Sequence, residues 1–147
     1  MIYKEETRDL FTVPEDYYLA HCISADFGMG KGIVLEFNKR FDMKRKLRTL
    51  FDGYLDEFLE YDYKSDCLMI PPVFNLITKE RYYQKPTYET MRGALEMMRK
   101  LALKNNVKKI AMPIIGCGLD RLKWNKLSEI IKDVFKDTYI EILVCRQ

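Results

Sequence analysis

The chain has 147 residues, of which 48% are hydrophobic and 32% are charged, a composition typical of one globular domain with a single sizeable core. Its 25 basic and 22 acidic residues give a net charge of +3, which is too small to indicate a nucleic-acid groove but would not repel a phosphorylated ligand. No apolar run is long enough to span a bilayer, and the charged segment "MIYKEETRDLF" has no signal-peptide pattern. We therefore expect a single cytoplasmic domain over residues 1–147, monomeric and without a membrane partner.

Alternating and periodic apolar residues predict strands and helices in an interleaved order. The predicted strands are, in chain order, "IYKEE" near the N-terminus (at a sheet edge), 17–23, 73–79, 107–115 and 139–145. The predicted helices run through Ile33, Phe37 and Phe41, from Thr87 to Asn105, and from Asn125 to Phe135. Between residues 42 and 70, "MKRKLRTLF" has a helical pattern, and the acidic and aromatic residues after it have no firm period.

The passage from 107 to 145 reads strand, glycine loop, helix, strand, which predicts a βαβ unit with a parallel pair of strands and a right-handed crossover. An earlier strand at 17–23 is likewise followed by a glycine loop and a helix. The fold class is therefore α/β, with helices on both faces of a central mixed β-sheet in one three-layer domain.

The four cysteines are scattered, and no C-x-x-C pair exists. With one histidine, His21, they do not match a zinc-ligand pattern, so we expect reduced thiols, no metal and no cofactor. His21 lies inside an apolar run and is expected to be a hydrogen-bonded core histidine rather than a catalytic base.

Two glycine loops follow predicted strands, Gly28-Met29-Gly30-Lys31-Gly32 and Gly116-Cys117-Gly118. In an open α/β sheet, ligands bind beyond the carboxyl ends of the strands, where helix N-termini and nests of N–H groups attract anions. Each loop alone is explained as well or better by a structural turn, and neither matches a P-loop or Rossmann fingerprint. Their equivalent positions along the chain favour two nests that face one diphosphate.

Four segments carry a family resemblance: "RDLF" (8–11), "AHCISADFGMGKGI" (20–33), "LITKERYYQKPTYE" (76–89) and "MPIIGCGLDRLKW" (112–124). They resemble a macrodomain, the ADP-ribose-binding α/β/α fold, and more narrowly the terminal ADP-ribose protein glycohydrolase subgroup. The order of the segments fits, and the resemblance covers nearly the whole chain apart from about residues 42–70.

The resemblance implies roles for individual residues. Lys79 would be the nucleophile and Asp120 its acid/base partner, although from the pattern alone Lys79 reads as a solvated lysine and Asp120 as a helix cap. Asp9 would accept a hydrogen bond from the adenine amino group, with Leu10 beside the ring. The ADP-ribose path would be lined by Ser24, Gly28, Met29, Gly30, Gly32, Ile33, Ile114, Ile115, Gly116, Cys117, Gly118 and Leu119.

One position departs from the subgroup, which commonly has an arginine where Ile114 stands, so one cationic contact to the ligand is missing. Two other features each have a structural and a functional interpretation. The aromatic residues are expected mostly in the core, although one aromatic residue at 82–83 could cover the ligand. The basic run at 39–48 is either a solvated helix face or a surface that steers a nucleic acid.

The implied reaction removes mono-ADP-ribose from glutamate or aspartate esters on proteins, so the expected partners are ADP-ribose and ADP-ribosylated protein. A lysine suits this reaction because its amine attacks the anomeric carbon and forms imines. The amine must first lose a proton, for which Asp120 would be the acceptor. Two alternatives stay open: a hydrolase that acts on ADP-ribosylated nucleic-acid bases such as those of DNA, as an antitoxin-type macrodomain does, and a non-catalytic ADP-ribose reader.

Overall fold

The structure is a computed structural model that describes residues 1–30, 32–54, 65–116 and 122–147. The strands are, in chain order, β1 (Ile2–Thr7), β2 (Tyr18–Ser24), β3 (Asp66–Ile70), β4 (Val73–Lys79), β5 (Lys109–Pro113) and β6 (Glu141–Arg146). The helices are α1 (Ile33–Phe41), α2 (Met43–Leu50), α4 (Tyr88–Lys104) and α5 (Trp124–Phe135), with a short 3-10 helix, η1 (Leu10–Thr12).

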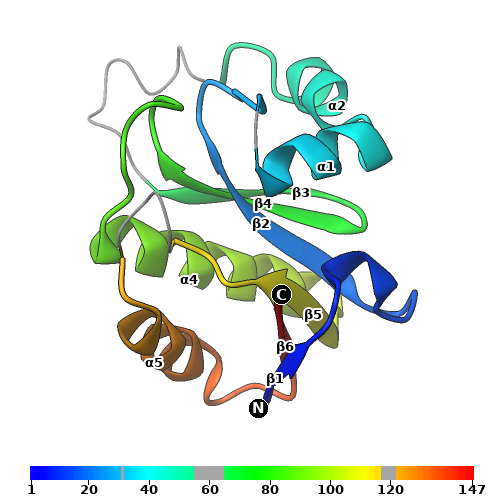
Figure 1. Cartoon of the computed structure of the whole chain (residues 1–147), viewed down its shortest axis with the longest axis vertical. Coiled ribbons are helices and arrows are strands. Elements are labelled where there is room, and N and C mark those ends of the chain that lie inside the picture. Colours follow the sequence, from blue (N-terminus) through cyan, green and yellow to red (C-terminus); the bar gives the residue numbers. More distant parts are fainter. Residues whose placement is uncertain (31, 55–64, 117–121) are drawn as a thin grey trace.

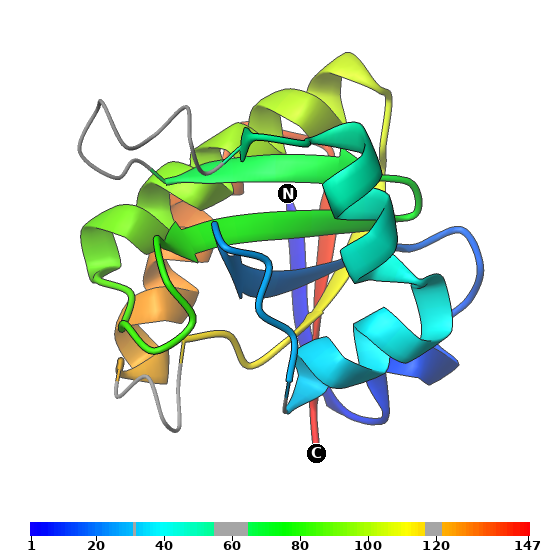
Figure 2. The same cartoon turned by 90° about the horizontal axis from the view of Figure 1, so that it is seen from above.

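The described strands form one sheet in the order β1-β6-β5-β2-β4-β3. Every neighbouring pair is parallel except β3 and β4, which are antiparallel. Helices α1 and α2 cover one face and α4 and α5 cover the other (Figures 1 and 2). The three-layer α/β/α architecture with a central mixed sheet is confirmed.

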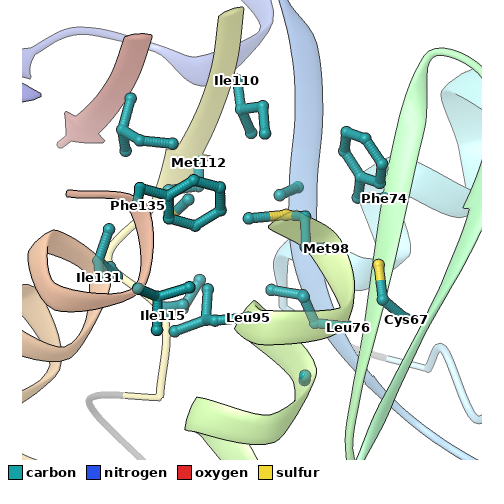
Figure 3. Packing of buried hydrophobic residues seen from close by; sticks show 14 of the residues in the cluster. Cys67, Phe74, Leu76, Leu95, Met98, Ile110, Met112, Ile115, Ile131 and Phe135 are labelled. Carbon is teal, nitrogen blue, oxygen red and sulfur yellow. The ribbon is translucent and has the colours of Figure 1, made fainter. Parts of the chain in front are cut away.

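Apolar periodicity explains why the helices lie where they do. In α4 a stripe of apolar side chains at three- and four-residue spacing is buried against the sheet: Met91, Ala94, Leu95, Met98 and Ala102. Figure 3 shows Leu95 and Met98 packed among side chains of α5 and of the strands. On the other face, residues of α1 and α2 pack with a second buried cluster. Each face of the sheet thus has its own apolar core.

Most of the predicted elements are confirmed, with small shifts at their ends. The strand at 73–79 has the predicted bounds, β1 lies at a sheet edge, and β5 and β6 form the predicted parallel pair. The predicted strand at 107–115 is longer than the observed β5, which leaves the sheet at Pro113. The segment "MKRKLRTLF" forms α2, whereas β3 has no counterpart among the predicted elements.

None of the helices that the structure describes is both long and apolar enough to cross a bilayer.

Candidate functional site

Three neighbouring parallel strands end at the same edge of the sheet. Strands β5, β2 and β4 are adjacent and parallel, so the segments that follow them lie together. The segment after β2 contains the first glycine loop, β4 ends at Lys79, and the segment after β5 leads to Gly116. Figures 1 and 2 show the segments after β2 and β4 side by side. The sheet thus brings the start of the first glycine loop, Lys79 and Gly116 to one edge.

Lys79 is the last residue of β4, and its side chain is partly exposed. The pairing of β2 with β4 is regular up to Ile23 and Ile77, and then a bulge brings Lys79 opposite Ser24. The extra residue is Thr78, which is buried. A bulge re-aims the side chains after it and is common next to active sites. Asp120, the predicted partner of Lys79, lies outside the described residues.

The first glycine loop leads into the N-terminus of α1. Gly32 is the N-cap, with φ +74° and no side chain to cap the helix, and its carbonyl accepts from the N–H of Leu35 at 3.1 Å. The N-terminus of a helix favours an anion. Met29 is buried, whereas Gly30 is exposed and Ile33 partly buried. A φ of this sign strongly favours glycine, so Gly32 is required for this approach to the helix.

Asp26, between β2 and the first glycine loop, was not assigned a role from the sequence, yet its carboxylate accepts three hydrogen bonds. Its Oδ1 accepts from the Ser24 hydroxyl and from the N–H of Gly28 at 3.1 Å, and its Oδ2 accepts from the N–H of Tyr82 at 3.0 Å. Ser24, predicted to line the ligand, is buried and donates its hydroxyl hydrogen to Asp26. An aspartate two residues after a serine is a weak local signal, and nothing in the sequence relates residue 26 to residue 82.

The second glycine loop is described as far as Gly116. Gly116 has φ +70°, and a Cβ there would lie 2.9 Å from Cδ1 of Leu127. Ile115 is buried, and Ile114 is partly buried and packs against the core. Glycine at 116 is therefore needed for the fold as well as for any ligand. The other predicted residues of this loop lie outside the described residues: Cys117, Gly118 and Leu119.

Asp9 and Leu10, the predicted adenine contacts, follow the end of β1. Asp9 caps η1, and its Oδ1 accepts from the N–H of Phe11 at 2.9 Å, while its side chain stays exposed. Leu10 is only 2% exposed and belongs to the buried cluster that includes Phe37 of α1. A contact between Leu10 and an adenine ring would therefore have to involve its backbone, and both roles stay predictions.

His21 is buried in β2, as expected, but only one of its ring nitrogens has a partner among the described residues. Nε2 lies 2.6 Å from Oδ1 of Asn75, while no described residue bonds to Nδ1. The ring stacks on Phe37 with 3.8 Å between the centroids. Complete burial lowers the pKa of His21 to about 4, and the hydrogen bond to Asn75 opposes this shift. His21 is therefore neutral at pH 7, and the expectation of a fully hydrogen-bonded ring is wrong at Nδ1.

Tyr82 and Tyr83 occupy the centre of a turn that is closed by the hydrogen bond from the N–H of Gln84 to the carbonyl of Arg81 at 3.1 Å. Their side chains are 66% and 70% exposed and pack edge to face. The turn begins two residues after Lys79. Both rings are therefore exposed beside this edge, and their role in covering a ligand stays a prediction.

Two hollows lie at opposite ends of β2. One, of about 150 Å³, adjoins Asp26 and is bounded on its other side by the end of α2 and by Arg48, Phe51 and Asp52. The other, of about 470 Å³, is lined by Phe11, Tyr17 and Phe41 among others and reaches Leu19 and Pro72 at the amino ends of β2 and β4. The larger hollow is thus away from the edge that carries Lys79. Among the described residues, no three His, Cys, Asp or Glu side chains gather closely enough to hold a metal ion.

Two known proteins are similar in sequence to this chain along nearly its full length. The chain is 43% identical to the ADP-ribose glycohydrolase OARD1 of Bos taurus and 42% identical to that of Homo sapiens, in each case over 92% of this chain and 86% of the relative. This chain belongs to the macrodomain family of ADP-ribose glycohydrolases. No protein-family model matches the chain.

Solved structures agree with this macrodomain in fold. The macrodomain of Thermus aquaticus DarG superposes with a TM-score of 0.74 at 17% identity, over 99% of each chain. Thermosipho africanus DarTG, solved in complex with ADP-ribose, superposes with a TM-score of 0.70 at 17% identity, over 99% of this chain and 42% of that one. At such identities the likeness concerns the fold alone.

Proposed function

We propose that this macrodomain releases mono-ADP-ribose from glutamate and aspartate esters on proteins, with Lys79 as nucleophile and Asp120 as acid/base. The observation that carries the proposal is the position of Lys79 at the end of β4, beside the first glycine loop, in a chain that is 43% identical to an ADP-ribose glycohydrolase. The N-terminus of α1 favours an anion, and the turn at Gly116 follows β5, the neighbour of β2 in the sheet. Diphosphate binding there would bring the distal ribose toward Lys79.

The chemistry follows from the electrophilic anomeric carbon of that ribose. The neutral amine of Lys79 attacks this carbon, a C–N bond forms, and the bond to the acyl oxygen breaks, so that the acceptor leaves as a carboxylate. The nitrogen passes its proton to the carboxylate of Asp120, and Asp120 returns that proton to the ring oxygen as the ribose ring opens to a Schiff base. Water then adds to the imine carbon with Asp120 as base, and free ADP-ribose and the lysine amine are regenerated.

The test is incubation with a peptide that carries ADP-ribose on glutamate, followed by mass spectrometry in the presence and absence of borohydride. We expect release of free ADP-ribose and, with borohydride, an adduct that maps to Lys79. Lys79→Ala should abolish hydrolysis and leave the Kd for ADP-ribose within about tenfold, or ~1.4 kcal/mol, because the phosphate contacts come from the glycine loops. Lys104→Ala, at the end of α4, is the matched control and should behave as the wild type.

Three results would contradict this assignment: full activity of Lys79→Ala, loss of ADP-ribose binding together with activity, or an adduct on another residue. The same assay separates the two alternatives. An intact peptide with tight ADP-ribose binding would favour a reader. Release from ADP-ribosylated DNA alone, falling steeply as salt is raised, would favour a nucleic-acid substrate, because contacts to phosphates are lost with salt.

A further inference from the structure

The carboxylate of Asp26 joins the segment after β2 to the segment after β4. Oδ1 accepts from the hydroxyl of Ser24 and the N–H of Gly28, and Oδ2 accepts from the N–H of Tyr82, 56 residues along the chain. We call these four residues the Asp26 clasp. Hydrogen bonds to an ionised carboxylate are roughly twice as strong as those between neutral groups. The clasp therefore fixes how far the first glycine loop lies from the turn that follows Lys79.

Backbone hydrogen bonds continue the pairing of the two strands up to the clasp. The N–H of Ala25 donates to the carbonyl of Lys79 at 2.9 Å, and the N–H of Asp26 donates to the carbonyl of Glu80 at 3.1 Å. Lys79 thus lies between the bulge at Thr78 and the clasp. Its backbone is held on both sides, and beyond the two backbone hydrogen bonds the side chain of Asp26 extends the connection to Tyr82.

Close packing inside the clasp gives Gly28 a reason to be glycine that does not involve a ligand. A Cβ at Gly28 would lie 2.9 Å from Cβ of Tyr82 and 3.4 Å from Oδ1 of Asp26. The backbone of the loop and the start of the Tyr82 side chain are therefore in direct contact. The exposed ring of Tyr82 starts from a fixed Cβ, so the clasp also sets where this ring can reach.

We propose that Asp26 is a positioning residue for the hydrolysis, and that its clasp holds Lys79 and the first glycine loop at the separation that the reaction needs. The inference rests on the proposed function, which assigns the nucleophile to Lys79. All the hydrogen bonds described for Asp26 go to groups of the protein, so its effect on the reaction is indirect. A nucleophile displaced by about 1 Å can lose a factor of about 100 in rate. When the clasp is broken, each loop can still adjust separately to ADP-ribose. The rate of hydrolysis should therefore fall more than the affinity for ADP-ribose.

The decisive variant is Asp26→Asn. Its amide oxygen can keep the two hydrogen bonds from Ser24 and Gly28, but its NH₂ group then faces the N–H of Tyr82, and two donors cannot bond. We expect the single-turnover rate on the glutamate-ADP-ribosylated peptide to fall on the order of 10- to 100-fold, while the Kd for ADP-ribose stays within about threefold. The rate of borohydride-trapped adduct formation at Lys79 should fall by the same factor.

Asp66→Asn is the matched control. Asp66 also accepts from a backbone N–H and a hydroxyl, those of Cys67 at 2.7 Å and Tyr54 at 2.9 Å, but it lies at the start of β3 and outside the clasp. Tyr54 reaches the segment after β2 through its ring, which stacks on Phe27 with 5.9 Å between the centroids. Asp66→Asn leaves this ring in place, so its variant should keep the single-turnover rate within about twofold of the wild type. The melting temperature of both variants shows how much of each effect is general loss of stability.

The outcomes separate this inference from the proposed function. A folded Asp26→Asn variant at the wild-type rate overturns the clasp, and so does an equal loss of rate in Asp66→Asn. A parallel loss of rate and of ADP-ribose affinity also overturns it, because Asp26 would then act in binding. If Lys79→Ala is fully active, the proposed function fails whatever Asp26 does. If Lys79→Ala is inactive and Asp26→Asn is unimpaired, only the clasp fails.

Discussion

The buried histidine of β2 makes the stability of the fold depend on pH in a predictable window. The pKa of His21 falls from 6.5 to about 4 because burial disfavours the imidazolium form. The difference corresponds to about 3 kcal/mol at about 1.36 kcal/mol per pH unit. Between these two pKa values the unfolded chain binds a proton that the folded chain does not, so the free energy of unfolding rises with pH. This stabilisation is complete above pH 6.5 and is lost as the pH falls from 6.5 to about 4.

The network around His21 indicates which nitrogen carries the proton. The NH₂ group of Asn75 donates to the carbonyl of Leu68 at 3.1 Å, so its Oδ1 is the atom that faces the imidazole. An amide oxygen only accepts, and the proton therefore lies on Nε2. Protonating Nδ1 would put a charge between the sheet and α1, where no described residue accepts from its N–H. This is the physical reason that acid should weaken the fold.

The perturbation is His21→Gln, which can still donate to Asn75 and does not titrate. Between pH 7 and pH 5 we expect the free energy of unfolding of the wild type to fall by about 2 kcal/mol more than that of the variant. Urea unfolding at several pH values measures this difference, and the contributions of the carboxylates cancel between the two proteins. Because the chain has one histidine, its ring-proton resonance can be followed without assignment. Parallel pH profiles, or a resonance that titrates near pH 6.5, would refute the reasoning.

Two further substitutions test the second glycine loop. Ile114→Arg should tighten ADP-ribose binding by about fivefold, or ~1 kcal/mol, because it adds a cation beside the proposed diphosphate site. Calorimetry at two salt concentrations checks this prediction, and an unchanged affinity at low salt would argue against a phosphate at that position. Gly116→Ala should cost about 1–3 kcal/mol in urea unfolding, because its φ is +70° and its Cβ would lie 2.9 Å from Leu127. Gly30→Ala, where a Cβ meets no described atom within 4 Å, is its control, and equal losses in both would contradict the steric argument.

The parts of the fold with a strong local pattern could be predicted from the sequence. The stripe in α4 repeats over about three turns, from Met91 to Ala102, and Thr87 caps the helix at the predicted start. Strand β3 has five residues, pairs with the sheet along one side only and follows a segment without a firm period. A short edge strand of this kind is specified by its neighbour, so the sequence pattern alone could not reveal it.

Some residues of the candidate site could likewise be predicted from the sequence, and others could not. Glycine loops are visible in a sequence because the conformational freedom of glycine is a property of the residue itself, as the positive φ values of Gly32 and Gly116 illustrate. Asp26 has no such signal. Its role depends on Tyr82, which reaches it only because β2 and β4 are neighbours in the sheet. Contacts between distant segments are set by the topology, and a pattern read along the chain does not contain them.

The bulge in β4 carries this argument one step further. Along the two strands the pairing is regular from Leu19 and Val73 onward, and Thr78 would stand opposite Ser24 if it stayed so. The extra residue puts Lys79 there instead, and a change of register by one residue reverses the face toward which a side chain points. The segment "LITKERYYQKPTYE" therefore identifies the lysine by its order in the chain, whereas the bulge and the Asp26 clasp decide where its amine can reach. A family motif can be complete in sequence and still depend on these two features for its chemistry.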